Sequence, residues 1–253
     1  MCLILISWRH HERYPLIIAS NRDEFYERPA SAIDYWEDYP DILGGRDLQA
    51  KGTWMGINAD RRFAALTNYR DGLTDPLENA PSRGDLVADY LKGSQPPEEY
   101  MKEVAAKGNA YNGFSLLVGN TKQLWYYSNR SPQLLPQELT PGIYGLSNAL
   151  LDTPWFKVQR GKELFQEKIQ SKQLHPRPFL DMLSDTERPA DEDLPDTGVP
   201  LEWERRLSSM FVQSDKYGTR ASTLLTINLD QRVMMCERQY DQKGHTSENI
   251  ISM

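Results

Sequence analysis

Apolar residues come in short, nearly unbroken runs at the start of the chain. Residues 2–8 and 15–20 are almost entirely hydrophobic, and a mostly polar stretch separates them. Runs of this length between polar residues are typical of strands that are buried on both faces. Residues 54–58 and 63–67 form a second pair of this kind, with a turn at 59–61. The first 67 residues are therefore predicted to form two pairs of strands.

Helices are expected in two later parts of the chain. The predicted helical segments are residues 82–93, 97–107, 154–170 and 177–184. Ser82 has the chemistry of an N-cap, and Asp85 three residues later partly matches a capping box. Pro154 suits the first turn of a helix, because its missing N–H would be unpaired there in any case.

The remaining segments are predicted as strands and loops. Further strands are expected at residues 114–119, 123–128, 142–146, 221–229 and 232–238. Residues 25–50, with Gly44 and Gly45 in a turn, and most of 171–200 are interpreted as loops. Because strands and helices are segregated along the chain, the order favours an α+β fold of antiparallel sheets with packed helices. We expect a single domain over residues 1–253.

The charge balance argues against nucleic acid or an anionic membrane as a partner. Acidic residues outnumber basic ones, 36 to 29, and the formal net charge is -7. No apolar stretch approaches the roughly 20 residues that span a bilayer, so no integral membrane segment is expected, and no secretory signal is evident. The two cysteines, Cys2 and Cys236, are too few for a disulfide framework, which favours the cytoplasm. The sequence does not predict an oligomeric state.

No cofactor and no metal site is predicted. No glycine-rich phosphate loop follows a strand, so a nucleotide site has no support. His10 and His11 are adjacent and would point to opposite faces of a strand, so we interpret them as part of a solvated turn. The acidic stretch at residues 185–196 lacks the spacing of an EF-hand and is interpreted as a solvated loop.

The second residue is the first candidate for chemistry. Cys2 follows the initiator methionine, which aminopeptidases remove when the next side chain is small. Removal of Met1 would put a thiol and a free α-amine on one residue, and the amine could act as general base for the thiol. The alternative is that Cys2 is a small buried hydrophobic residue, as free cysteines often are. Retention of Met1 would exclude the proposed chemistry.

Polar clusters lie at the ends of four predicted strands, at residues 20–24, 67–71, 147–148 and 217–222. Each cluster alone has an ordinary explanation, because asparagine and aspartate often occupy turns next to strands. Together with Cys2 they supply the parts of an acyl-transfer site. A thiol, two asparagine side chains and an Asp/Arg pair would serve as the nucleophile, the oxyanion donors and the groups that orient them.

These clusters also carry a resemblance to a known family. The run Ser-Asn-Arg-Asp-Glu at residues 20–24, behind an N-terminal Met-Cys, resembles the NRDE-motif family, also called the transport and Golgi organisation 2 family. Further matches lie at residues 44–47, 52–56, 67–70, 146–148 and 218–220. The motifs occur in the family's order and cover most of the chain, which is therefore identified as a member.

A more distant resemblance is to N-terminal nucleophile hydrolases of the penicillin V acylase and bile-salt hydrolase type. It implies a four-layer αββα sandwich of two antiparallel sheets. It also implies that Asp23 holds the Cys2 α-amine, and that Arg220 lies near the nucleophile. Asn68 and Asn148 match the asparagines that bind the oxyanion and the amine. The arginine of that group's motif is displaced here, at Arg22.

The resemblance implies a hydrolase or acyltransferase that acts on a non-peptide amide or thioester, with Cys2 as nucleophile after removal of Met1. A small-molecule acyl or amide substrate is the expected partner, and loops 25–50 and 175–215 are expected to set its specificity. The residues expected to bind it are Asn21, Arg22, Glu24, Trp54 and Tyr69. The alternative is a non-catalytic carrier on the same fold, whose apolar ligand would be haem or an acyl lipid.

Overall fold

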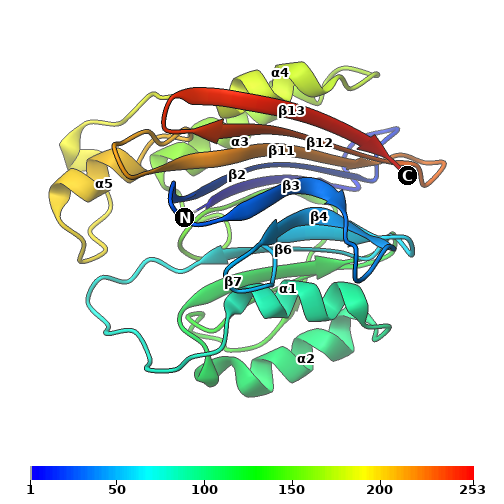
Figure 1. Ribbon diagram of the computed structural model, residues 1–253, viewed down its shortest axis with the longest axis horizontal. Coiled ribbons are helices and arrows are strands. Elements are labelled where there is room, and N and C mark those ends of the chain that lie inside the picture. Colours follow the sequence, from blue (N-terminus) through cyan, green and yellow to red (C-terminus); the bar gives the residue numbers. More distant parts are fainter. Residues whose placement is uncertain (1) are drawn as a thin grey trace.

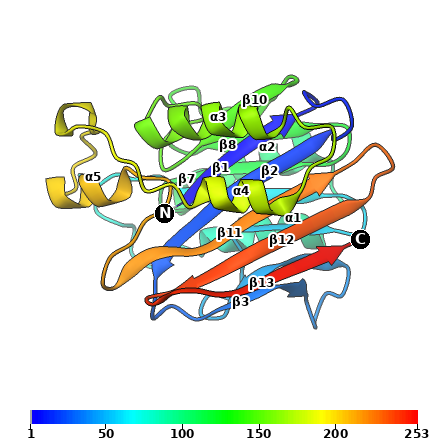
Figure 2. The same cartoon turned by 90° about the horizontal axis from the view of Figure 1, so that it is seen from above.

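Two antiparallel sheets stack face to face, and each carries helices on its outer side (Figure 1, Figure 2). The computed structural model describes residues 2–253. The first sheet has the strand order β10 (Gly142–Leu146), β1 (Cys2–Trp8), β2 (Leu16–Phe25), β11 (Tyr217–Ile227), β12 (Val233–Asp241) and β13 (Gly244–Ser252). The second has the order β3 (Ala30–Tyr35), β4 (Ile42–Asp47), β5 (Met55–Asn58), β6 (Phe63–Asn68), β7 (Phe114–Gly119), β8 (Leu124–Ser128) and β9 (Gln137–Glu138).

The helices complete a four-layer αββα sandwich, so the expected α+β fold class is confirmed. Helices α3 (Phe156–Lys168) and α4 (Pro176–Leu183) cover the first sheet, while α1 (Arg83–Lys92) and α2 (Pro97–Lys107) cover the second (Figure 1). Helix α5 (Leu201–Leu207) lies at one end of the sandwich. Two short 3₁₀ helices span Gly108–Ala110 and Asp191–Asp193. Within residues 2–253, no helix has the length and apolar character needed to cross a membrane.

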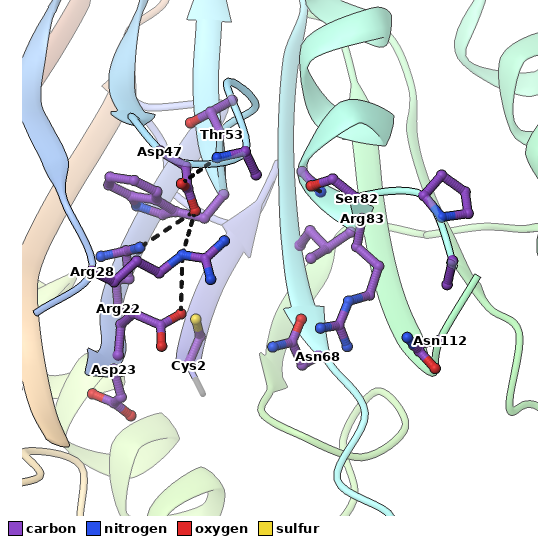
Figure 3. A pocket seen from close by; sticks show the side chains of 17 residues that line it. Cys2, Arg22, Asp23, Arg28, Asp47, Thr53, Asn68, Ser82, Arg83 and Asn112 are labelled. Atoms are coloured by element: carbon purple, nitrogen blue, oxygen red, sulfur yellow. Dashed lines mark hydrogen bonds and ion pairs between the residues drawn. The ribbon is translucent and has the colours of Figure 1, made fainter. Parts of the chain in front are cut away.

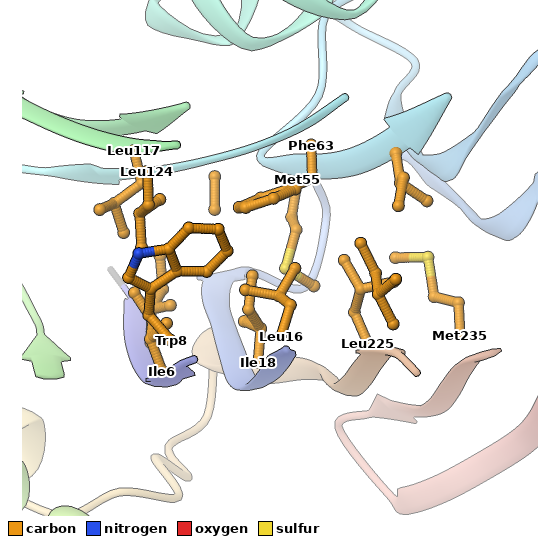
Figure 4. Packing of buried hydrophobic residues seen from close by; sticks show 14 of the residues in the cluster. Ile6, Trp8, Leu16, Ile18, Met55, Phe63, Leu117, Leu124, Leu225 and Met235 are labelled. Atoms are coloured by element: carbon orange, nitrogen blue, oxygen red, sulfur yellow. The ribbon is translucent and has the colours of Figure 1, made fainter. Parts of the chain in front are cut away.

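The unbroken apolar runs follow from this layering, because both faces of the central strands are buried. On β1, Leu3 and Leu5 pack against the helix layer, whereas Ile6 and Trp8 point into the space between the sheets. Figure 4 shows these two side chains facing residues of the second sheet, among them Phe63. Each such side chain contributes roughly 1.5–3 kcal/mol by leaving water.

The segment 25–50 is not the loop that we expected. It contains β3 and β4, and the pair Gly44 and Gly45 lies within β4 rather than in a turn. Glycine is required there because neighbouring groups approach closely. A β-carbon on Gly44 would lie 2.8 Å from the Met55 carbonyl oxygen, and one on Gly45 would lie 2.5 Å from the Trp54 ring. The glycines therefore mark a crowded strand.

Several element boundaries also differ from the prediction. Strand β2 runs to Phe25, so the polar residues 21–24 lie within the strand instead of following it. Helix α3 begins at Phe156 with Trp155 as its N-cap, two residues after Pro154. Helix α5 and the edge strand β13 were not predicted. The Ser82 N-cap is confirmed, since its hydroxyl accepts a hydrogen bond from the Gly84 N–H.

A buried carboxyl group links the two sheets. Glu237 on β12 is 1% exposed, and its Oε1 accepts a hydrogen bond from the Ile33 N–H on β3 at 3.0 Å. The Thr223 hydroxyl donates to its other oxygen at 3.3 Å. Burial raises the pKa of Glu237 to about 7, because a charged carboxylate loses its hydration between the sheets.

This raised pKa predicts a pH-dependent stability. Because the folded protein holds the Glu237 proton more tightly than the unfolded chain, the stabilisation is complete below about pH 4.5 and is lost as pH rises through 7. We expect the free energy of unfolding of the wild type to fall by roughly 3 kcal/mol over this range relative to Glu237→Gln. Urea unfolding at several pH values measures the difference. Glu163→Gln, at an exposed position, should match the wild type, and equal pH slopes for Glu237→Gln would contradict the prediction.

Candidate active site

A cavity of about 320 Å³ opens where β1, β2 and β6 meet the start of α1. Figure 3 shows Cys2 and Arg22 on one side of it and Asn68 and Arg83 on the other. Its lining comprises Cys2, Arg22, Asp23, Glu24, Arg28, Asp47, Ala50, Thr53, Trp54, Leu66, Asn68, Ala80, Pro81, Ser82, Arg83, Gly84 and Asn112. Most of these side chains are polar or charged.

Cys2 is the first residue of β1, directly opposite Arg22 of β2. Side chains alternate along a strand, so Cys2 shares the face of Ile4 and Ile6, which points between the sheets. The residue is 9% exposed, and burial raises the pKa of its thiol. Its carbonyl oxygen accepts a hydrogen bond from the Ser147 hydroxyl at 3.0 Å, which fixes the start of the strand.

Asp23 lies deep in the site at 1% exposure. The Thr219 hydroxyl donates to its Oδ1 at 2.7 Å, and the Tyr217 hydroxyl donates to its main-chain oxygen at 2.9 Å. Burial raises the pKa of Asp23, and the nearby positive charge of Lys157 opposes that shift. Strand β11 supplies both of these hydroxyl groups, which hold the main chain and the carboxyl group of Asp23 in position.

Lys157, on the first turn of α3, is a buried cation that the sequence analysis missed. It is 2% exposed, and its Nζ makes no hydrogen bond to any residue of the described chain. Burial lowers the pKa of Lys157 to about 8, while the charges of Asp23 and Cys2 act in the opposite direction. Nothing in the local sequence distinguishes it from an exposed helical lysine.

Asn68 ends β6 and is held by the segment that follows β10. The Thr67 hydroxyl donates to the Ser147 carbonyl at 2.6 Å, and the Asn148 side-chain amide donates to the Asn68 carbonyl at 2.9 Å. Across residues 2–253, the Asn68 side chain itself makes no hydrogen bond, so its amide is available to the cavity. Asn148 lies behind Asn68 and does not line the cavity.

The wall that carries Arg22 is a network of paired charges. Arg28 Nε lies 2.7 Å from Asp47 Oδ2, and Arg22 Nη2 lies 3.9 Å from the same oxygen. Arg28 also lies 3.9 Å from Glu24. The Arg22 guanidinium stacks 4.2 Å from the Trp54 ring. Of the five residues expected to bind substrate, the structure therefore brings Arg22, Glu24 and Trp54 into the cavity.

Asn21 and Tyr69 do not line the cavity. Asn21 is one residue out of phase with Arg22 on β2, so its side chain faces the helix layer. There its amide donates to the carbonyls of Leu183 and Met210, both at 2.8 Å. The Tyr69 N–H donates to the Gly113 carbonyl at 2.9 Å, which holds the main chain just after β6.

Arg220 also lies outside the cavity, for a different reason. The register between β11 and β2 shifts at this residue, so Arg220 has no partner on β2. Its guanidinium donates to the main-chain carbonyls of Phe25, Tyr26 and Arg28 at 2.9–3.1 Å. It therefore holds the turn after β2, and Arg22 is the arginine that lies opposite Cys2.

Residues outside the expected set complete the cavity. Asp47 and Thr53 lie in motifs that carried the family resemblance, and their place in those motifs was a usable signal. Arg28 and Arg83 follow no motif and reach the cavity only through the fold. Within residues 2–253, no group of three or more histidine, cysteine or acidic side chains could hold a metal ion. His10 and His11 lie in the bend between β1 and β2 as expected.

Two stacked antiparallel sheets with outer helices, and a cysteine opening the first strand, define an N-terminal nucleophile hydrolase-like fold. The solved structure of penicillin V acylase from Agrobacterium tumefaciens has this fold. The alignment covers 100% of this chain and 86% of that one, at a TM-score of 0.51 and 10% identity.

The chain belongs to the Transport and Golgi organisation 2 family, whose model matches residues 1–242. The Bos taurus Transport and Golgi organization protein 2 homolog is 38% identical over 94% of this chain and 92% of its own length. The Homo sapiens homolog is 36% identical over 96% of this chain and 94% of its own length. The membership expected from the sequence motifs is confirmed.

The two thiols should differ in reactivity. Cys2 lines the cavity, whereas Cys236 is 0% exposed and burial raises its pKa to about 12. We expect iodoacetamide to modify the native protein once, at Cys2, with a rate that rises with pH because only the thiolate reacts. Peptide mass spectrometry identifies the site. Cys236→Ala should label like the wild type, and labelling of Cys2→Ala at the wild-type rate would refute the assignment.

Proposed function

We propose that this protein is an N-terminal cysteine hydrolase or acyltransferase that acts on a non-peptide amide or thioester, with Cys2 as nucleophile. The observation that carries the proposal is that one cavity holds Cys2, Asp23 and Asn68. Removal of Met1 is part of the proposal, since Met1 lies outside the described residues. It would give Cys2 the free α-amine that serves as its base.

In the first half-reaction, the Cys2 sulfur attacks the substrate carbonyl carbon, and the α-amine takes the thiol proton. The carbonyl oxygen becomes an oxyanion, and the Asn68 side-chain amide donates a hydrogen bond to it. Collapse of the intermediate breaks the bond to the leaving group, which takes the proton back from the amine. The product is an acyl thioester on Cys2.

In the second half-reaction, water or another acceptor attacks the thioester carbonyl. The α-amine accepts a proton from the attacking molecule and returns it to the departing Cys2 sulfur. A water acceptor makes the protein a hydrolase, and an amine or alcohol acceptor makes it an acyltransferase. The polar lining of the cavity suits either acceptor.

Four residues act in this proposal by positioning other groups. Asn148 fixes the main chain of Asn68 through its 2.9 Å hydrogen bond, and so directs the oxyanion donor. Asp23 holds the α-amine, and Lys157 favours the ionised form of Asp23 because burial otherwise disfavours that charge. Arg220 contributes by holding the turn that carries Arg28.

The carrier hypothesis has less support than acyl transfer. A site for haem or an acyl chain needs an extended apolar wall, because the gain on binding comes from buried apolar surface. Trp54 and Leu66 are the large apolar residues of this cavity, and charged groups surround them. The cytoplasmic location expected from the sequence remains part of the proposal, since a reducing compartment keeps the Cys2 thiol free.

The requirement for a free cysteine amine can be tested directly. A glycine inserted between Met1 and Cys2 would leave the thiol in place and join its amine to another residue. We expect both this variant and Cys2→Ala to lose hydrolysis of acyl p-nitroanilides and acyl thioesters that the wild type cleaves. The inserted variant should still be alkylated at Cys2, and Cys236→Ala should keep full activity. Unchanged turnover in Cys2→Ala would rule out the mechanism.

The oxyanion role predicts a specific loss in Asn68→Ala. Removing one such donor weakens binding of the transition state more than that of the substrate, so kcat should fall about 100-fold, or about 3 kcal/mol, with a smaller change in KM. Asn249→Ala is the matched control, because Asn249 lies on the edge strand β13. A higher KM with an unchanged kcat would speak against this role.

A further inference from the structure

Cations line both sides of the cavity, but only those on one side are neutralised. Arg22 and Arg28 share the carboxylate of Asp47, and Arg28 also lies near Glu24. On the opposite wall, Arg83 has no carboxylate within 4.0 Å anywhere in the described chain. Arg83 therefore leaves a positive charge facing the cavity that contains Cys2.

Arg83 has donor groups to spare. It is the first residue of α1, it is half-buried, and its Nη1 donates to the Gly113 carbonyl at 3.1 Å. This one bond orients the guanidinium, while its other N–H groups have no acceptor within residues 2–253. Burial lowers the pKa of Arg83, yet an arginine keeps its charge at neutral pH. Figure 3 shows the group pointing toward Asn68.

Asn112 adds a neutral donor on the same wall. The Leu77 N–H donates to its Oδ1 at 2.8 Å, which fixes the orientation of the amide and leaves Nδ2 as the outward group. Within the described chain, Nδ2 makes no hydrogen bond. Figure 3 shows its nitrogen on the side that faces Arg83. The Arg83 guanidinium and the Asn112 amide thus both have N–H groups on this wall that bond to no acceptor within the described residues.

We propose that Arg83 and Asn112 bind an anionic oxygen group of the substrate, a carboxylate or a phosphate, while Cys2 attacks the acyl carbonyl. The inference rests on the proposed function and narrows it to anionic acyl compounds. A planar guanidinium matches the oxygens of either group through paired hydrogen bonds. Arg28 lies 2.7 Å from Asp47 and 3.9 Å from Glu24, and the charge of Glu24 acts on Arg83 only from beyond 4.0 Å, so the guanidinium N–H groups stay available to a ligand.

Protection of Cys2 from iodoacetamide tests the subsite without requiring turnover. The labelling rate is measured by intact-protein mass spectrometry at constant ionic strength with glutarate, inorganic phosphate or the neutral analogue glutaramide. We expect glutarate or phosphate to slow the labelling of the wild type, and glutaramide to have no effect. The anion that protects distinguishes a carboxylate site from a phosphate site.

Two variants assign the effect to this wall. Arg83→Gln and Asn112→Asp should each raise the half-protecting concentration about tenfold or more, because each loses a hydrogen bond to a charged group. Asn112→Asp keeps the acceptor for Leu77, so it remains informative if Arg83→Gln does not fold. Arg177→Gln removes the same charge from a side chain that is 85% exposed on α4, and it should behave as the wild type.

The outcomes separate this inference from the proposed function. Absence of protection by both anions in the wild type, or equal protection in Arg83→Gln and Asn112→Asp, would overturn the subsite. Protection without cleavage of any acyl compound would support the subsite and count against the hydrolase. Cleavage of neutral acyl thioesters without protection by either anion would support the hydrolase and count against the subsite.

Discussion

The site depends on a short segment that ties the two sheets together. Ser147 and Asn148 follow the edge strand of the first sheet, and both are almost completely buried. The Ser147 hydroxyl bonds to the Cys2 carbonyl, its own carbonyl accepts from Thr67, and the Asn148 amide bonds to the carbonyl of Asn68. Because leaving a buried polar group unpaired costs free energy, these three hydrogen bonds are strongly favoured in the folded protein. They set the position of Cys2 on one sheet relative to Asn68 on the other.

The protein also contains a set of buried charges that do not favour stability on their own. Asp23 and Lys157 are buried next to the cavity, and Arg70 lies 3.1 Å from Glu204 with both side chains almost fully enclosed. Burying charged groups costs several kcal/mol each before their mutual attraction offsets it. A fold selected for stability alone would place apolar residues here. Asp23 and Lys157 lie near Cys2, where the proposed acyl transfer would require charges in fixed positions, and this supports a chemical role for the cavity.

Much of the fold could be predicted from the sequence, because the spacing and the length of apolar runs indicate which faces of an element are buried. The apolar run of β1 appears as one buried strand since both of its faces are covered. The same reasoning failed for β3, where Ile33 is the only buried residue and the other residues of the strand are partly or largely exposed. It failed again for β4, because Gly44 and Gly45 normally indicate turns. Here they serve a close approach between strands that no local pattern reveals.

For the site, the sequence by itself determined the nucleophile candidate and the motifs, and therefore the family. Tertiary structure alone decided which motif residues face the cavity. Within one motif, Arg22 lines the cavity and Asn21 does not, since successive strand residues point to opposite faces. A one-residue register shift leaves Arg220 outside the cavity lining. Arg83 and Lys157 carry no local signal, because their role comes from burial and from neighbours distant in the chain. A sequence pattern shows the spacing of apolar and polar side chains along a segment, whereas only packing determines what surrounds each of them.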